Sequence, residues 1–197
     1  MALNCEDKLS GNILKDCDNK PKGGLEVNAV LINFEDIDKT ASTLDATNDL
    51  IITNLATASG TTGYFLEGIK QTNGIAVELV IKEDSFDAFT HTFSGVILAP
   101  SAANKKAAAE IVSGGRYVVV VEKKWKGEDG ADAFEVLGWD SGLYASVLTY
   151  NSKESDGVIK FELASQEGYE EPEISRNLLE TDYATTKIAF DAAFATA

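Results

Sequence analysis

Turn signals recur about every ten residues along the second half of the chain, and this spacing limits its fold more than any other feature. The turns are the acidic, glycine-bounded segment 127–130, the triplet 140–142 and the polar stretch 151–156. Regular turns between short apolar runs are typical of a meander in a β-sandwich or β-barrel. They divide this region into four predicted strands, at 116–124, 133–139, 143–150 and 157–165.

Five more strands are predicted in the first half of the chain. Residues 27–34 carry apolar groups on both alternating faces, which predicts a strand that is buried on both sides. Asn73 and Gly74 both tolerate positive φ, so we expect a tight turn where two of the strands join. The five predicted strands are 27–34, 50–55, 64–70, 75–82 and 86–99.

One helix is predicted at 102–112, where the sequence is rich in alanine, the strongest helix former. Ser101 is placed to cap its N-terminus, and Gly114-Gly115 ends it. Its apolar stripe is narrow. We therefore expect it to cover an edge of the sheet or the mouth of a barrel.

With 197 residues, the chain is long enough for one domain with a sizeable core. We predict a single mainly β domain over 1–197, an antiparallel β-sandwich or barrel with one flanking α-helix. An N-terminal arm at 1–26, a long polar loop at 35–63 and a C-terminal arm at 174–197 complete it.

The long loop and the C-terminal arm both carry large apolar residues that favour burial. A neighbouring subunit is one surface that could bury them, so these residues are predicted to form an oligomer interface. They are Leu44, Leu50, Ile52, Leu55, Tyr183, Ile188, Phe190 and Phe194.

The composition is strongly acidic, with 17 Lys and Arg residues against 32 Asp and Glu residues and a formal net charge of −15. Such a surface disfavours binding to nucleic acid and to anionic membranes, because both require basic residues. The acidity has two interpretations. It keeps the protein soluble, or it lines a surface along which a polyanion slides without sticking.

No set of residues points to catalysis, to a metal or to a cofactor. The single histidine, His91, lies in an alternating apolar run and is interpreted as a half-buried strand residue rather than a general base. Phosphate-binding glycine motifs and the nucleophile motif GxSxG are absent. Cys5 and Cys17 can close a short disulfide loop, although two unpaired thiols suit a reducing cytoplasm better.

The order of elements resembles the tail tube proteins of long-tailed bacteriophages: a strand, a long polar loop, further strands, one alanine-rich helix, a meander and a C-terminal arm. Residues 17–25, which lead into residues 30–38, also look like small virion proteins of phages and prophages of the Bacteroidota. In the tail tube family, a β-sandwich or barrel is flanked by one helix, while a long loop and the terminal arms bridge neighbouring subunits.

The resemblance implies a structural subunit without enzymatic activity, assembled in a bacterial host's cytoplasm and located in the virion tail. Its partners would be copies of itself, in stacked and usually hexameric rings, and other tail proteins. DNA would pass the acidic lumen without specific binding, and no membrane would be involved. A capsid decoration or head-to-tail connector protein is the first alternative. The second is a carbohydrate-binding or adhesive sandwich that uses Trp125, Trp139, Tyr144 or Tyr150 as a stacking platform.

Overall fold

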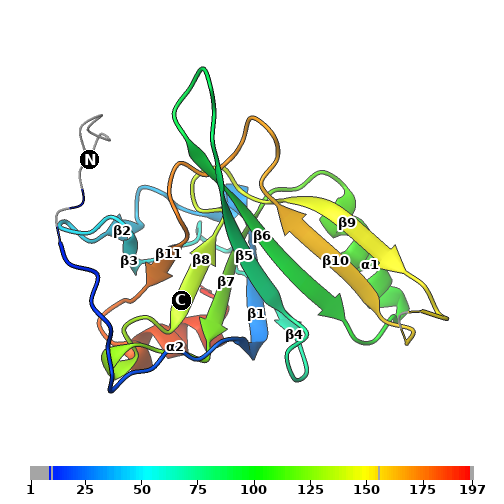
Figure 1. The fold of residues 1–197 in the computed structure, drawn as a ribbon. Helices are drawn as coiled ribbons and strands as arrows, with labels where there is room; N and C mark the ends of the chain where they lie inside the picture. Colours follow the sequence, from blue (N-terminus) through cyan, green and yellow to red (C-terminus); the bar gives the residue numbers. More distant parts are fainter. Residues whose placement is uncertain (1–8, 10, 155, 196–197) are drawn as a thin grey trace.

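Two β-sheets and two α-helices make up the part of the chain that the computed structural model describes, residues 9, 11–154 and 156–195 (Figure 1). The larger sheet has seven strands, in the spatial order β2 (Thr43–Leu44), β3 (Ile51–Asn54), β11 (Arg176–Leu178), β8 (Phe134–Leu137), β7 (Tyr117–Lys123), β1 (Leu25–Asn33) and β4 (Tyr64–Glu67). The smaller sheet has four, in the order β5 (Gly74–Val80), β6 (Ala88–Ile97), β10 (Ile159–Ala164) and β9 (Tyr144–Tyr150). Every pair of neighbouring strands is antiparallel except β3 and β11. The predicted mainly β fold with a flanking helix is confirmed, as an open two-sheet arrangement rather than a closed barrel.

Strands β1 and β7 lie in the larger sheet and are buried on both faces. Val30 and Ile32 point to one face while Leu31 points to the other, and all three are buried. The four consecutive valines of β7, residues 118–121, have no exposed surface. The prediction that the first strand is buried on both sides is confirmed, because each face of the larger sheet is covered by another layer.

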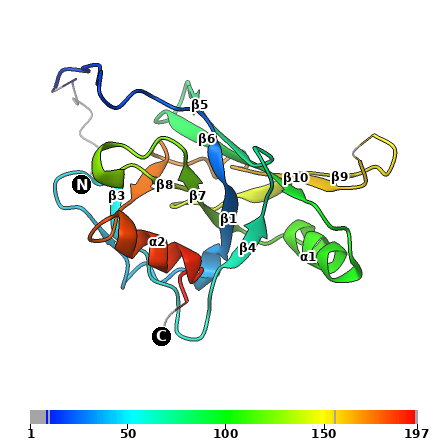
Figure 2. The ribbon, with the colours of Figure 1, turned by 90° about the horizontal axis from the view of Figure 1, so that it is seen from below.

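The two covering layers differ in kind. On one face, the C-terminal helix α2 (Tyr183–Asp191) packs Phe190 onto Phe134 of β8, with ring centroids 5.2 Å apart. On the other face, the smaller sheet contributes Phe93, Phe161 and Leu163 to a second apolar cluster. Figure 2 shows α2 and the smaller sheet on opposite sides of β1 and β7.

The C-terminal segment is part of this fold and not an arm, which corrects the prediction for 174–197 over the described residues. Strand β11 pairs with both β3 and β8. Helix α2 begins after Asp182, whose carboxylate accepts a hydrogen bond from the Thr185 backbone N–H. Phe190 and Phe194 are buried in the chain's own core. These side chains cover the valine-rich strands. The sequence of the C-terminal segment alone does not show that those strands are its packing partners.

The predicted long loop at 35–63 is also folded onto the larger sheet. It contains a single 3-10 turn (Phe34–Asp36) and the short strands β2 and β3. Strand β3 pairs with β11, and Ile52 and Leu55 are buried beside it. The segment therefore extends the sheet and does not project from it as a free loop.

Helix α1 (Ala102–Val112) has the predicted bounds, and its N-terminus is capped as expected. The Ser101 hydroxyl oxygen accepts a hydrogen bond from the Asn104 backbone N–H at 3.2 Å. Ala108 is the helix's one buried residue. The helix lies beside β9 at one end of the smaller sheet, where it covers an edge and adds little to the core (Figure 1).

The turn at Asn73-Gly74 is not the tight hairpin that the sequence suggests. Strand β4 pairs with β1, whereas β5 pairs with β6, so the chain crosses here from the larger sheet to the smaller one. The Asn73 side-chain amide donates a hydrogen bond to the Val27 carbonyl oxygen at 3.0 Å. At Gly68, a Cβ would lie 2.3 Å from the same oxygen, so this crossover requires glycine.

Truncating the α2 anchor should reveal how much the C-terminal segment contributes to stability. We expect Phe190→Ala to lower the free energy of unfolding by about 3–5 kcal/mol, because it removes a fully buried ring. Ile188→Ala on the same helix is the matched control, since Ile188 is 71% exposed and its loss should cost less than about 0.5 kcal/mol. Urea unfolding measures both. Equal effects of the two substitutions would contradict the packing described here.

Candidate self-association surfaces

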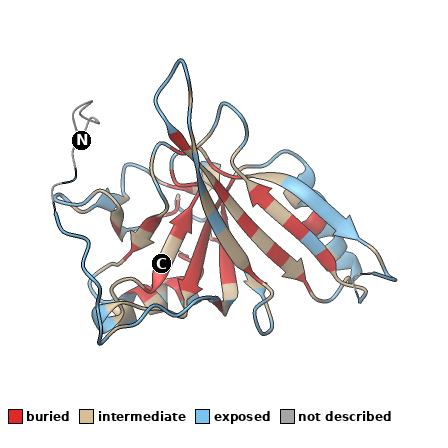
Figure 3. Cartoon of the chain, viewed as in Figure 1, coloured by how far each residue is buried: buried red, intermediate tan, exposed pale blue. Residues whose placement is uncertain are grey.

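The smaller sheet has two open edges, and both carry large exposed apolar residues. Strand β5 forms one edge and β9 forms the other. Leu79 of β5 is 56% exposed and Val147 of β9 is 44% exposed, with Leu148 and Tyr150 of β9 also exposed. Figure 3 shows a long exposed stretch along β9. An open, apolar strand edge offers unpaired backbone groups to another strand. These edges are therefore candidate surfaces for self-association.

The outer face of the smaller sheet, by contrast, combines small hydroxyl groups and charged side chains with two valines, Val96 and Val147. Because side chains alternate along a strand, Thr92 and Ser94 of β6 point away from the buried Phe93. Lys160 and Glu162 of β10 lie on the same outer face, paired with Val96 and Ser94. This face thus has mixed charge and does not concentrate the acidity of the chain.

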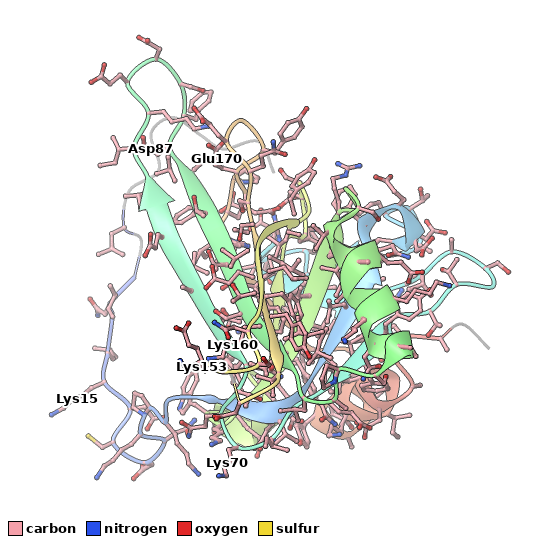
Figure 4. All side chains as sticks on the ribbon, turned by 90° about the vertical axis from the view of Figure 1, so that its right-hand side faces the viewer. Lys15, Lys70, Asp87, Lys153, Lys160 and Glu170 are labelled. Carbon is pink, nitrogen blue, oxygen red and sulfur yellow. The ribbon has the colours of Figure 1, made fainter. Side chains whose placement is uncertain are left out.

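The β5–β6 connection projects from one end of the smaller sheet, and the exposed Ile81 and Phe86 flank its charged tip, which includes Glu83 and Asp84. Lys82 ties the connection to the neighbouring 165–173 segment through an ion pair with Glu170 at 2.8 Å. Figure 4 shows Asp87 and Glu170 at this end of the molecule and Lys70 at the opposite end.

A groove of about 650 Å³ runs between β4 and α1. Strand β4 is one of the two edge strands of the larger sheet, so the groove lies along unpaired backbone groups. Its walls are mainly apolar, with Phe65, Ile69 and Ile111 among them, and its carboxylates are Glu67 and Glu110. The sequence contains no signal for this groove, because it forms only where two distant segments approach each other.

The segment 9–24 that precedes β1 has no regular secondary structure over its described residues. Its apolar side chains Leu9, Ile13 and Leu14 are each at least 81% exposed. The Trp125 indole N–H donates a hydrogen bond to the Asn19 carbonyl oxygen at 3.2 Å and so fixes the base of the segment. Residues 9–24 are hereafter called the N-terminal arm; of the predicted arm 1–26, Leu25 and Glu26 belong to strand β1.

The residues predicted to form an oligomer interface separate into two groups. Ile52, Leu55, Phe190 and Phe194 are buried in the chain's own core and are not available to a partner, so their assignment to an interface is wrong. They were misassigned because a large apolar residue in an irregular segment looks the same whether its own chain or a partner covers it.

The other four predicted interface residues keep some exposed surface. Leu44 and Ile188 are exposed, while Leu50 and Tyr183 are half-buried. Tyr183 is held by its own chain, since its hydroxyl donates to Glu122 at 2.7 Å and its ring stacks on Phe134. An interface role for these four residues stays a prediction.

His91 lies on the inner face of β6 and is almost fully buried. Its Nδ1 accepts a hydrogen bond from the Gly138 backbone N–H at 3.2 Å, so the proton is on Nε2, which donates to the Glu173 carbonyl oxygen at 3.1 Å. Burial lowers the pKa of His91 to about 4. The histidine joins three segments of the chain and has no free nitrogen for acid–base work.

Glu171 is a second buried group in this region. Its carboxylate oxygens accept hydrogen bonds from the Asp140 and Ser141 backbone N–H groups, each at 2.8 Å. Burial raises the pKa of Glu171. Arg176 pairs with Asp140 and donates to the Asp49 carbonyl oxygen. These contacts fasten the 165–176 segment to β6 and to the end of β8, which is a structural role.

The two tryptophans do not form an open platform. Trp139 is buried, and the Lys39 ammonium lies 3.2 Å from its ring centroid. Trp125 is half-buried beneath the N-terminal arm. Tyr144 and Tyr150 stand at opposite ends of β9. The aromatic residues considered for sugar stacking are therefore distributed over separate places.

The described residues offer no metal site and no membrane-spanning helix. No group of three or more His, Cys, Asp and Glu residues there is arranged to hold a metal ion. Neither described helix is long and apolar enough to cross a membrane. Cys17 is an exposed free thiol, and Cys5 lies outside the described residues. Comparison with known proteins finds no matching family model, no matching curated protein and no matching solved structure.

The buried histidine should make stability depend on pH. The folded chain keeps His91 neutral down to about pH 4, whereas the unfolded chain protonates it near its ordinary pKa of 6.5. The unfolded state therefore binds more protons between these values, and stability is lost as pH falls. When the pH falls from about 7.5 to about 5, the titration of His91 should lower the free energy of unfolding by about 2 kcal/mol.

His91→Gln removes this titration and leaves all other groups in place. We expect the difference in unfolding free energy between wild type and variant to shrink by that amount over the same pH range. Urea unfolding at several pH values measures it. A difference that does not change with pH would show that His91 is not held neutral.

Proposed function

We propose that the chain is a structural virion protein, the major tail tube subunit of a long-tailed phage, which assembles with copies of itself into stacked rings and has no catalytic role. One observation carries the proposal: the two open edges of the smaller sheet, β5 and β9, lie on opposite sides of it and both expose apolar residues. When one edge of a subunit pairs with the opposite edge of the next, the contact is head-to-tail. Repeated head-to-tail contacts close into a ring if the rotation from each subunit to the next divides a full turn.

The direction of the strands supports this contact. Three antiparallel pairings separate β5 from β9, so the two edge strands run in opposite directions. In a ring whose axis lies along the strands, β5 of one copy therefore meets β9 of the next in antiparallel orientation. The alternation within each subunit then continues around the ring without a break, and the ring has no open edge on this sheet.

The size of such a ring suits a tube for DNA. Six copies would join 24 strands of the smaller sheet. With strands spaced about 4.8 Å apart, the ring has a circumference of roughly 115 Å and a diameter of roughly 37 Å before strand tilt widens it. This bore is wide enough for a double helix.

The face that would line the bore also suits passage of DNA. It carries hydroxyl groups, Lys160 and the carboxylates of Glu78 and Glu162. A surface with one lysine against two carboxylates per copy gives phosphate groups no cluster of positive charge to bind. This is a milder property than the strongly acidic lumen suggested by the net charge of −15, because most carboxylates lie elsewhere.

A charge placed on an edge strand should prevent assembly. We expect Leu148→Lys or Leu79→Lys, which lie on the two edge strands and point away from the bore, to weaken self-association at least about tenfold, because a lysine ammonium cannot be buried in an apolar strand-to-strand contact. Sedimentation velocity measures the shift toward the 21.1 kDa monomer. Ile174→Lys is the matched control, since Ile174 is 46% exposed and lies outside both edge strands, and it should assemble like the wild type.

The wild-type protein, imaged by negative stain at high concentration, should show rings or tubes. Wild-type chain that sediments only as a monomer at every concentration and salt condition would contradict the proposal. Discrete assemblies that survive both edge substitutions would also contradict it, because another surface would then hold the copies together.

A further inference from the structure

We propose that the N-terminal arm of one copy docks in the β4–α1 groove of the neighbouring copy and adds a strand to the open edge of β4. This inference rests on the proposed ring, and it names a contact site that the paired sheet edges do not include. An extended segment commonly binds a sheet edge in this way, with its backbone hydrogen-bonded to the edge and its side chains in neighbouring pockets.

In the single chain, the apolar side chains of the arm and the apolar lining of the groove are both exposed to solvent. The two surfaces are complementary in polarity and in charge. Leu9, Ile13 and Leu14 of the arm are almost fully exposed, although large apolar side chains favour burial. The groove offers an apolar lining with the carboxylate of Glu67 at its edge, for which the described residues provide no ion pair. Lys15 of the arm supplies the opposite charge beside Leu14.

The positions of the two parts agree with the proposed ring. The base of the arm, residues 21–24, lies beside Gly74 and Ile75 at the start of β5. Helix α1, one wall of the groove, lies beside β9, and Lys105 stands 5.0 Å from the Tyr150 ring centroid. When β5 of one copy pairs with β9 of the next, the arm therefore emerges on the side where the neighbour has its groove.

The arm and the groove also lie at the same end of the smaller sheet. Gly74 pairs with Ser94, close to the end of β6, where Ile97 lines the groove. Tyr150 pairs with Ile159, which in turn pairs with Ile97. Figure 4 agrees, with Lys15 of the arm and Lys70 beside the groove both at the end opposite Asp87.

The arm is long enough for this contact. Asn19, where Trp125 holds the arm, is ten residue steps from Leu9, and these steps span up to roughly 33 Å when extended. Reaching the neighbour's groove requires crossing β9 and β10 to β6, which is roughly 15 Å. In the structure the arm runs away from the groove of its own chain, toward the side where β2 and β3 lie (Figure 1).

A thiol placed on the arm itself allows a direct test in the full chain. In a background with Cys5→Ser and Cys17→Ser, Asn12→Cys places one thiol among the apolar residues of the arm and Ile69→Cys places a second in the groove. A short bismaleimide joins thiols that lie close together. We expect cross-links between chains, visible as dimers and higher ladders under denaturing conditions. Asp84→Cys, at the tip of the β5–β6 connection, is the matched control and should give none.

Sedimentation of the same samples separates the two proposals. Rings without a cross-link to position 69 would overturn arm docking and leave the ring in place. A cross-link within one chain would also overturn it, since the arm would then occupy its own groove. A chain that stays monomeric and forms no cross-link would overturn both proposals.

A second variant tests the apolar side chains of the arm themselves. Replacing Leu9, Ile13 and Leu14 together by Ser should weaken self-association about tenfold or more, because their burial between copies is lost. The thermal midpoint of the monomer should not change, since all three are exposed in the single chain. Unchanged self-association would contradict the proposed docking.

Discussion

The fold depends on the need to cover two strands that are apolar on both faces. Val30, Leu31 and Ile32 of β1 and the four valines of β7 leave no side of these strands that water can solvate. Two layers must therefore pack against the larger sheet, α2 on one face and the smaller sheet on the other. This requirement draws the C-terminal segment into the core. It also orients the smaller sheet, with its inner face used for packing and its outer face and both edges left to solvent.

Local features of the fold could be predicted from the sequence, because they depend on interactions between residues that are close in sequence. The four strands of the second half follow from turn spacing, although β7 and β8 pair in the larger sheet and β9 and β10 in the smaller one. Helix 102–112 follows from its alanines, the Ser101 cap and Gly114. Burial of β1 on both faces follows from its unbroken apolar run. In each of these cases, residues close in sequence supply both the signal and the interaction.

Features that depend on distant segments could not be predicted. Phe190 and Phe194 pack against strands that are distant from them in the sequence. In the sequence alone, they look like apolar residues that a partner subunit covers. Asn73 looked like a hairpin residue, yet its side chain holds a crossover by bonding to Val27. The β4–α1 groove exists only once β4 joins β1. The residues of the proposed interface, such as Val147, are ordinary strand residues until the sheet order places them on an edge.

The central claim is that the β5 and β9 edges pair between copies, and hydrogen exchange of backbone amides tests it most directly. The full chain would be measured when dilute and when concentrated enough to assemble. The account predicts that amides of β5 and β9 near Leu79 and Val147 exchange quickly in the dilute sample and become protected on assembly. The amides of β7, buried in both samples, should not change. Assembly without new protection on either edge strand would contradict the account.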